Sequence, residues 1–204
     1  MTTIREIMTM APVIPVIVID DAAQARPLAE ALVAGGITAL EVTLRTDAAL
    51  DAIRAMKEVP GALVGAGTVL NPADFEAARE AGAEFIVSPG LTQPLGKAVT
   101  DAGVPFLPGT ANAGDIMRGL DLGLTHFKFF PAMASGGLPA LKAIASAFGQ
   151  CRFCPTGGIS EDNAADWLGL DPVLCVGGSW LAPKGSTDYA AIEASARRAA
   201  SLRA

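Results

Sequence analysis

One run of aromatic and β-branched residues carries a single lysine and ends at a proline: Gly123-Leu124-Thr125-His126-Phe127-Lys128-Phe129-Phe130-Pro131. Successive side chains of a strand point to opposite faces, so Phe127 and Phe129 share one face while Lys128 and Phe130 share the other. If the strand is buried, the Lys128 ammonium is removed from water, which is costly unless the charge is paired. Burial favours the neutral amine, a nucleophile towards ketones. The alternative is an edge-strand lysine that lies in solvent.

The composition of the whole chain is consistent with buried strands. The 204 residues are enough for one large domain or two small ones, and 51% of them are hydrophobic. The mean hydropathy of +0.41 fits strands that are covered on both faces. No apolar run reaches the roughly 18 residues of a spanning helix, and residues 1–10 lack the apolar core of a signal peptide. We therefore expect a cytoplasmic protein with no membrane partner.

The charge and the metal-binding residue types exclude several functions. A net charge of −6 argues against a nucleic-acid partner, and an anionic substrate would need local positive groups in a pocket. Cys151, Cys154 and Cys175 are an odd number in an apparently cytosolic chain, which argues against disulfides. Cys151 and Cys154 match C-x-x-C, but residues three apart on a strand face opposite sides. The single histidine, His126, cannot form a zinc cluster, and we expect it to be a packed interior residue. No metal or other cofactor is expected.

Strand and helix signals alternate along the chain after a short helical stripe in residues 1–10. We expect strands at residues 13–19, 38–44, 62–66, 84–87, 105–107, 125–130, 151–154 and 173–176. Helix starts are indicated at Asp20-Asp21, Thr46-Asp47, Asn71-Pro72, Thr92, Ser160-Glu161-Asp162-Asn163 and Asp188. The strand–helix units recur about every 21 to 26 residues, and no linker interrupts them.

This pattern predicts a closed (β/α)8 TIM barrel of minimal size, with residues 1–204 forming one domain and a short helix at the N-terminus. A doubly wound open sheet is the alternative. It is less favoured because no strand–G-x-G-x-x-G–helix unit opens the chain. In a barrel, functional residues gather at the C-terminal ends of the strands, so these ends form one surface.

The strand that contains Glu41 directs polar side chains inward. Glu41, Thr43 and Arg45 share the face opposite Leu40 and Val42. A carboxylate and a guanidinium inside a barrel should be paired or functional. An internal ion pair that only fixes the barrel is one interpretation. With an inward Lys128, however, the set suits keto-acid chemistry, because arginine can bind a carboxylate and glutamate can transfer protons.

Glycines and hydroxyls follow several other strands. Gly65-Ala66-Gly67-Thr68 allows close approach and offers a hydroxyl, although tight packing would also explain the glycines. Ser88-Pro89-Gly90 and Pro108-Gly109-Thr110 are by themselves only turns. Gly157-Gly158 and Gly177-Gly178 follow the last two strands, where barrels often bind phosphate through backbone N–H groups.

Six segments together carry a resemblance to a known family: residues 36–45, 65–72, 88–92, 123–136, 154–160 and 177–180. They are similar to the class I aldolases that act on 2-keto-3-deoxy-6-phosphogluconate (KDPG) and often on 4-hydroxy-2-oxoglutarate (KHG). The segments at 36–45 and 123–136 resemble the two active-site signatures of that family. The likeness covers nearly the whole chain.

The resemblance implies a role for each matching residue. Lys128 would form a Schiff base and Glu41 would be the general acid and base. The residues expected to bind substrate are Arg45 and Thr68 for the pyruvate carboxylate, Pro89, Phe130 and Thr156 in the pocket, and Gly157, Gly158, Gly178 and Ser179 for the phosphate. The resemblance further implies a metal-independent aldehyde-lyase of the Entner–Doudoroff pathway, without a cofactor and assembled as a homotrimer.

Two alternatives remain open at this point. The first is an aldolase for another sugar acid, such as the galactonate-derived epimer or KHG. The second is a phosphate-binding barrel without carbon–carbon chemistry, either an isomerase or a binding module. A binding module needs no inward lysine opposite an inward glutamate, and a proton-transfer isomerase would leave Lys128 without a role.

Overall fold

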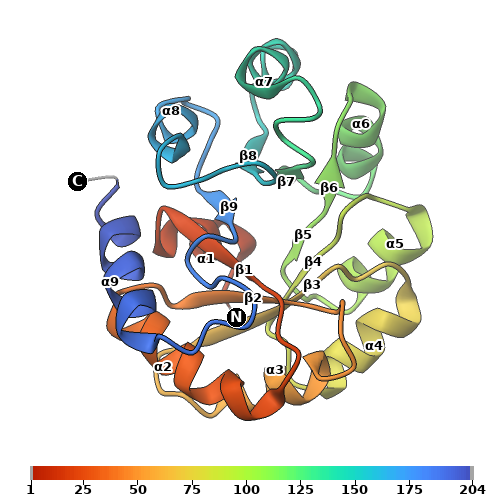
Figure 1. Ribbon diagram of the computed structural model, residues 1–204. Helices are drawn as coiled ribbons and strands as arrows, with labels where there is room; N and C mark the ends of the chain where they lie inside the picture. The colour runs from red at the N-terminus through yellow and green to blue at the C-terminus, as the bar shows by residue number, and fades with distance from the viewer. Residues whose placement is uncertain (1, 203–204) are drawn as a thin grey trace.

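Helices and parallel strands alternate through the part of the chain that the computed structural model describes, residues 2–202 (Figure 1). The elements are α1 (Ile4–Met10), β1 (Val13–Ile17), the 3₁₀ helix η1 (Ala22–Gln24), α2 (Ala25–Ala34), β2 (Ala39–Thr43), α3 (Ala49–Lys57), β3 (Leu63–Gly67), α4 (Pro72–Glu80), β4 (Phe85–Val87), α5 (Gln93–Asp101), β5 (Phe106–Leu107), β6 (Gly109–Thr110), α6 (Ala113–Asp121), β7 (His126–Phe129), α7 (Gly137–Ala145), β8 (Arg152–Pro155), α8 (Ala164–Leu168), β9 (Val176–Gly178) and α9 (Tyr189–Ala200).

The strands form two parallel sheets. The larger is a curled six-stranded sheet in the order β5-β4-β3-β2-β1-β9, and the smaller has the order β6-β7-β8. Pro108 alone separates β5 from β6, and single bridges join Phe153 to Val173 and Thr156 to Gly177. The α/β class with parallel strands is therefore confirmed. The order places the last strand beside the first, which excludes the doubly wound sheet.

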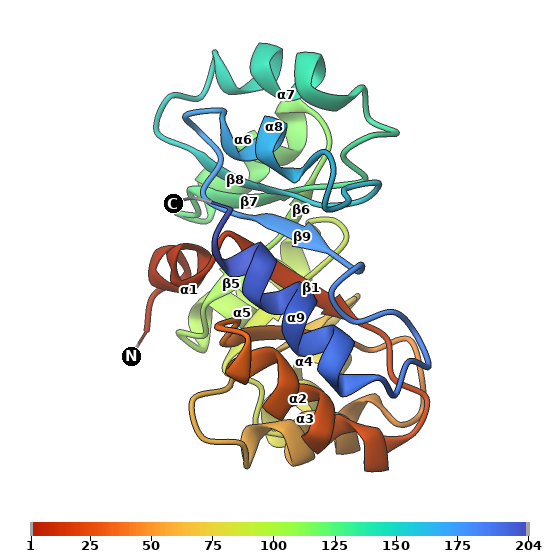
Figure 2. The same ribbon diagram turned by 60° about the vertical axis from the view of Figure 1, so that its left-hand side comes forward.

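The buried side chains form two apolar clusters on opposite faces of the strands. The outer cluster lies between strands and helices and includes Leu40, Val42, Phe127 and Phe129. The inner cluster holds Ile14, Ala39, Phe85, Val87, Leu107, Cys154 and Cys175, together with Ile7 and Met8 of α1. Helix α1 thus packs against the inner faces of the strands, and Figure 2 shows it on one side of the sheet. The other helices cover the outer faces of the strands.

Several helix starts follow the predicted capping residues. Asn71, Thr92 and Asp188 each accept a backbone N–H of the first turn of α4, α5 and α9. Asp21 caps the 3₁₀ turn that leads into α2. Thr46-Asp47 does not cap α3, because the Thr46 hydroxyl donates to the carbonyl of Ile19.

Helix α8 begins at Ala164, directly after the predicted start at residues 160–163, and the Asn163 side chain accepts the N–H of Ser160. One boundary differs from the prediction. The last strand lies at Val176–Gly178 rather than at 173–176, and Val173 forms an isolated bridge with Phe153. The shift places Gly177 and Gly178 within β9. None of the helices within residues 2–202 is long and apolar enough to span a membrane.

Candidate active site

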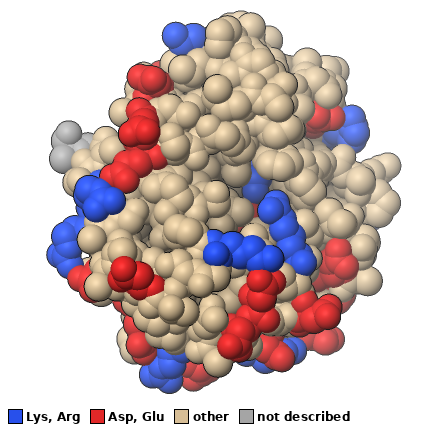
Figure 3. Space-filling view, in the orientation of Figure 1, with Lys and Arg blue, Asp and Glu red and all other residues tan. Residues whose placement is uncertain are grey.

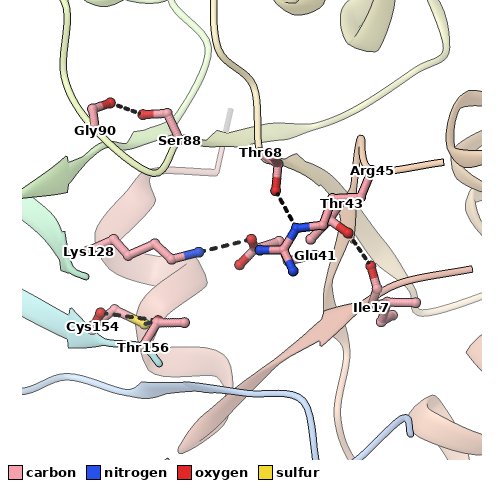
Figure 4. Close-up of polar contacts among 10 residues, drawn as sticks. All are labelled: Ile17, Glu41, Thr43, Arg45, Thr68, Ser88, Gly90, Lys128, Cys154 and Thr156. Carbon is pink, nitrogen blue, oxygen red and sulfur yellow. Dashed lines mark hydrogen bonds and ion pairs between the residues drawn. The ribbon is translucent and has the colours of Figure 1, made fainter. Parts of the chain in front are cut away.

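Lys128 and Glu41 form a buried pair inside the curled sheet. The Lys128 Nζ donates to Glu41 Oε1 at 3.1 Å, and the two side chains are only 6% and 3% exposed. The same Nζ lies 5.3 Å from the centre of the Phe130 ring. Figure 4 shows the lysine and the glutamate pointing toward each other across the interior. The inward direction predicted for both residues is therefore confirmed, and the solvent-exposed edge lysine is excluded.

Strand register explains why the two side chains meet. Glu41 on β2 is level with Val16 of β1 and Gly65 of β3. Lys128 on β7 is level with Gly109 of β6 and with Cys154 of β8, which belongs to the inner cluster. Side chains at the same level of neighbouring parallel strands point to the same face. The lysine and the glutamate thus approach each other from opposite walls of the same interior.

Gly67, at the end of β3, leaves the space that the Glu41 carboxylate occupies. A Cβ at this position would lie 2.2 Å from Oε1 of Glu41. Gly65 likewise leaves space for the Phe85 ring, because a Cβ at Gly65 would lie 2.5 Å from it. These glycines are therefore explained by side-chain packing within the interior.

Arg45 and Thr68 lie together at the mouth of the interior. Arg45 Nε donates to Thr68 Oγ1 at 3.2 Å, and its two terminal nitrogens have no hydrogen-bond partner within residues 2–202 (Figure 4). Thr68 has a φ of +57°, the only positive φ among the non-glycine residues that the structure describes. This backbone aims the hydroxyl at Arg45 at a conformational cost. The pair presents free guanidinium donors suited to a carboxylate.

A cavity of about 150 Å³ connects these groups to the glycines that follow β8 and β9. Its lining contains the predicted residues Arg45, Lys128, Phe130, Thr156, Gly157, Gly158 and Ser179. Gly157 and Gly158 have φ values of +103° and +77°, a conformation that favours glycine. The turn places backbone next to the cavity without side chains in the way. Larger hollows occur elsewhere, such as the one beside Thr2 and Glu6, but no lysine lines it.

Four predicted residues do not line this cavity: Glu41, Thr68, Pro89 and Gly178. Glu41 and Thr68 instead contact two residues that do, Lys128 and Arg45. Pro89 lies against β6, because a Cβ at Gly109, level with Lys128, would lie 2.1 Å from the Pro89 carbonyl oxygen. Gly178 lies between two residues of the lining, Gly177 and Ser179, and the Trp180 ring covers its Cα. A side chain at Gly178 would therefore displace the tryptophan.

Sequence reasoning missed two residues of the lining, Val16 and Ile159, and named Gly177 only as half of the Gly177-Gly178 pair. Val16 could have been found from strand register, since it is level with Glu41. Gly177 is required because a Cβ there would lie 2.1 Å from the Thr156 hydroxyl oxygen. Thr156 itself is 5% exposed and donates to the carbonyl of Cys154 at 3.4 Å.

His126 and the C-x-x-C cysteines lie apart from this chemistry. His126 is half-buried at the start of β7, and burial, with Arg5 and Arg152 nearby, lowers its pKa. Cys151 belongs to the outer cluster and Cys154 to the inner one, so their side chains point in opposite directions as predicted. Within residues 2–202 no group of three His, Cys, Asp or Glu side chains could hold a metal ion.

The fold and the site together define a class of enzyme. A buried lysine amine, a carboxylate 3.1 Å away and a guanidinium at the mouth of the same cavity are the groups needed to bind a 2-keto acid and convert its ketone to an imine. Proton transfer by the carboxylate then permits carbon–carbon cleavage next to the imine. This is the arrangement of a class I aldolase.

Comparison with known proteins identifies the family. Residues 4–195 match the family described as "Aldolase: KDPG and KHG aldolase". The 2-dehydro-3-deoxy-phosphogluconate aldolase of Zymomonas mobilis is 59% identical over 203 residues, which cover 100% of this chain and 98% of that protein. The chain belongs to the KDPG and KHG aldolase family.

Solved structures agree with this assignment. The 2-keto-3-deoxy-6-phosphogluconate aldolase of Zymomonas mobilis ZM4, crystallised with 3-phosphoglycerate, is 59% identical with a TM-score of 0.97, over 98% of this chain and 96% of that one. The KDPG aldolase of Legionella pneumophila is 46% identical with a TM-score of 0.95, over 98% and 99% of the two chains. Its structure holds pyruvate captured as a covalent carbinolamine intermediate.

Proposed function

We propose that the protein is a metal-independent class I aldolase that reversibly cleaves KDPG to pyruvate and glyceraldehyde 3-phosphate. The observation that carries this proposal is the Lys128 amine, 3.1 Å from Glu41 Oε1 in the cavity that also contains the Gly157-Gly158 turn. The carbinolamine captured in the Legionella pneumophila relative is the intermediate expected when an amine attacks the pyruvate ketone.

The proposed mechanism begins with attack of the Lys128 amine on the C2 ketone of the substrate. Loss of water gives an imine, which accepts the electron pair of the bond to be broken. Glu41, through a water, removes the proton of the C4 hydroxyl, and the C3–C4 bond breaks. Glyceraldehyde 3-phosphate leaves, and an enamine of pyruvate remains on Lys128. Glu41 returns a proton to C3 of the enamine, and hydrolysis of the imine releases pyruvate.

The remaining residues are proposed to hold the two ends of the substrate. Arg45 and Thr68 bind the carboxylate next to the ketone, supported by the two terminal nitrogens that Arg45 leaves unpaired within residues 2–202 while its Nε donates to the Thr68 hydroxyl at 3.2 Å. The backbone of Gly157, Gly158 and Gly178, with Ser179, binds the phosphate at the opposite end. Pro89, Phe130 and Thr156 shape the space between them. Binding energy from the phosphate then orients the reacting carbons.

A second substrate, KHG, is proposed because the family includes aldolases for it. KHG lacks a phosphate, so it would use the carboxylate and imine sites without the glycine turn. A side-by-side comparison of kcat/KM for KDPG, its galactonate-derived epimer and KHG tests both proposals. Preference for KDPG is expected. Equal values would show that the phosphate site contributes little, and absence of pyruvate release from all three would refute the aldolase.

The finer architecture is also a proposal. We propose that the two sheets close into one (β/α)8 barrel that forms a single domain over residues 1–204. Support comes from the bridges between β8 and the segment leading into β9, and from β5 and β6, which Pro108 alone separates. A cytoplasmic homotrimer is proposed from the family resemblance. Analytical ultracentrifugation would test it, and a monomer at micromolar concentration would contradict it.

A further inference from the structure

A second cavity adjoins the catalytic one at the mouth of the strands. It has a volume of about 460 Å³ and shares Val16, Arg45 and Ser179 with the catalytic cavity. Its outer wall comes from the loop after β9, including Trp180, Pro183 and Lys184. The two cavities adjoin at these shared residues, and together they form a path that extends from Lys128 to the loop after β9.

The lining of this path is positive although the protein as a whole is acidic. Arg45, Lys128 and Lys184 line the two cavities, and no Asp or Glu within residues 2–202 does, although Glu41 and Asp20 pair with the two lysines from outside the lining. In the orientation of Figure 3, Lys and Arg side chains gather near the middle of the face, with acidic side chains mostly around them. With a net charge of −6, the protein depends on this local field to attract an anion.

The proposed phosphate site lacks a charge partner of its own. Gly157, Gly158, Gly178 and Ser179 offer only neutral N–H and O–H donors, whereas a phosphate monoester carries nearly two negative charges. Lys128 is committed to the imine and Arg45 to the carboxylate. Of the three cations that line the path, Lys184 alone has no role in the proposed mechanism.

Lys184 is held near this site by a contact that is easily exchanged. Its Nζ lies 3.0 Å from Oδ2 of Asp20, in the loop after β1, and both side chains are nearly 60% exposed. Exposed ion pairs of this kind are weak, because water screens both charges. A phosphate arriving at the rim can therefore replace the aspartate as the partner of the lysine.

We propose that Lys184 is a specificity-determining residue that binds the substrate phosphate, and that Asp20 competes with the phosphate for it. This inference rests on the proposed aldolase function and deepens its phosphate site. Lys184 supplies the charge that the glycine turn lacks, and so favours phosphorylated over unphosphorylated substrates. Asp20 keeps the lysine at the rim when no anion is bound.

Two substitutions separate this role from a structural one, because Lys184→Met and Asp20→Asn break the same ion pair. If the pair only ties the two loops together, both variants should change binding in the same direction. If Lys184 binds phosphate, the variants should act in opposite directions: Lys184→Met weakens binding about fivefold, and Asp20→Asn tightens it about twofold. Lys184→Arg should retain most of the affinity.

The measurement is calorimetric titration of the full chain with 3-phosphoglycerate, with unphosphorylated glycerate as the matched control ligand. The opposite shifts should appear for 3-phosphoglycerate and vanish for glycerate, and added salt should weaken the wild type more than Lys184→Met. Unchanged affinity in Lys184→Met, weaker binding in both variants, or no binding by the wild type would overturn the proposal. Borohydride trapping of pyruvate, run in parallel, tests the aldolase separately, since the pyruvate imine does not involve Lys184.

Discussion

Replacing Gly67 by alanine should slow turnover while leaving imine formation nearly intact. The new Cβ would lie 2.2 Å from Oε1 of Glu41, and also 2.7 Å from its Cγ and 2.8 Å from its Cδ. Non-bonded carbon and oxygen atoms do not approach so closely, so the carboxylate must retreat by roughly 1 Å. The φ of Gly67 lies outside the left-handed region, so the backbone accepts alanine without further strain.

The size of the effect follows from this displacement. Glu41 Oε1 lies 3.1 Å from Lys128 Nζ, and a shift of roughly 1 Å misplaces the carboxylate relative to the C4 hydroxyl. Misplacement of this size costs roughly 10²-fold in rate. We therefore expect kcat for KDPG cleavage to fall by about two orders of magnitude. Overpacking should lower the free energy of unfolding by about 1–3 kcal/mol, which leaves the protein folded.

The assay compares three variants by steady-state cleavage of KDPG, borohydride trapping of pyruvate and thermal denaturation. Gly149→Ala is the matched control, because a Cβ there meets nothing within 4 Å. Glu41→Gln should resemble Gly67→Ala in forming the imine without turnover. A Gly67→Ala variant with the kcat of Gly149→Ala would refute the positional role of Glu41. A Gly67→Ala variant that is folded but loses imine formation as completely as turnover would also refute this role of Glu41.

Three other predictions concern the surrounding groups. Thr68→Gly should be about 1 kcal/mol more stable to unfolding than Thr68→Ala, because glycine accepts the φ of +57°. Both variants lose the Arg45 contact and should raise the KM for KDPG to a similar extent. Equal stabilities of the two variants in denaturant titration would contradict this. Lys128→Met should lower the free energy of unfolding by about 3–5 kcal/mol, because it leaves Glu41 buried without its partner. The double variant Lys128→Met/Glu41→Gln should recover most of this stability. A double variant less stable than Lys128→Met would argue against the buried pair. Burial lowers the pKa of His126 below 6.5, so its neutral form is favoured in the folded state. Stability should therefore fall as the pH drops below about 6.5, because the unfolded chain then takes up the proton. His126→Gln should flatten the dependence of Tm on pH between about 6.5 and 5, and an unchanged slope would exclude this contribution.

The direction of the catalytic side chains could be predicted from alternation alone. On a parallel strand covered on both sides, residues two apart share a face, so placing Phe127 toward the helices fixes Lys128 toward the interior. The same argument placed Glu41. That the two would meet at hydrogen-bond distance could not be deduced, because the register between β2 and β7 depends on the strands between them.

Helix starts were predictable where a local bond decides them and failed where a tertiary contact competes. Asn71 and Thr92 cap their helices because their side chains have no better partner. Thr46 has the same chemistry but donates instead to the Ile19 carbonyl, 27 residues away in sequence. Nothing in the local sequence reveals that carbonyl.

The glycines were the least predictable part of the site. The position of Gly157 and Gly158 after a strand predicted a phosphate-binding turn, and both residues have a positive φ in the structure. Gly67 was expected only to allow close approach, and its partner, the Glu41 carboxylate, comes from a neighbouring strand. Glycine in a sequence indicates that something is close but does not identify the neighbour.

Trapping of the imine tests the central claim most directly. The protein is incubated with pyruvate, reduced with borohydride and digested, and the peptides are analysed by mass spectrometry. The buried pair at 3.1 Å predicts loss of activity together with a reduced pyruvyl adduct on Lys128, absent from Lys128→Met. An active enzyme that yields no adduct at Lys128, or one that carries the adduct on another lysine, would contradict the account.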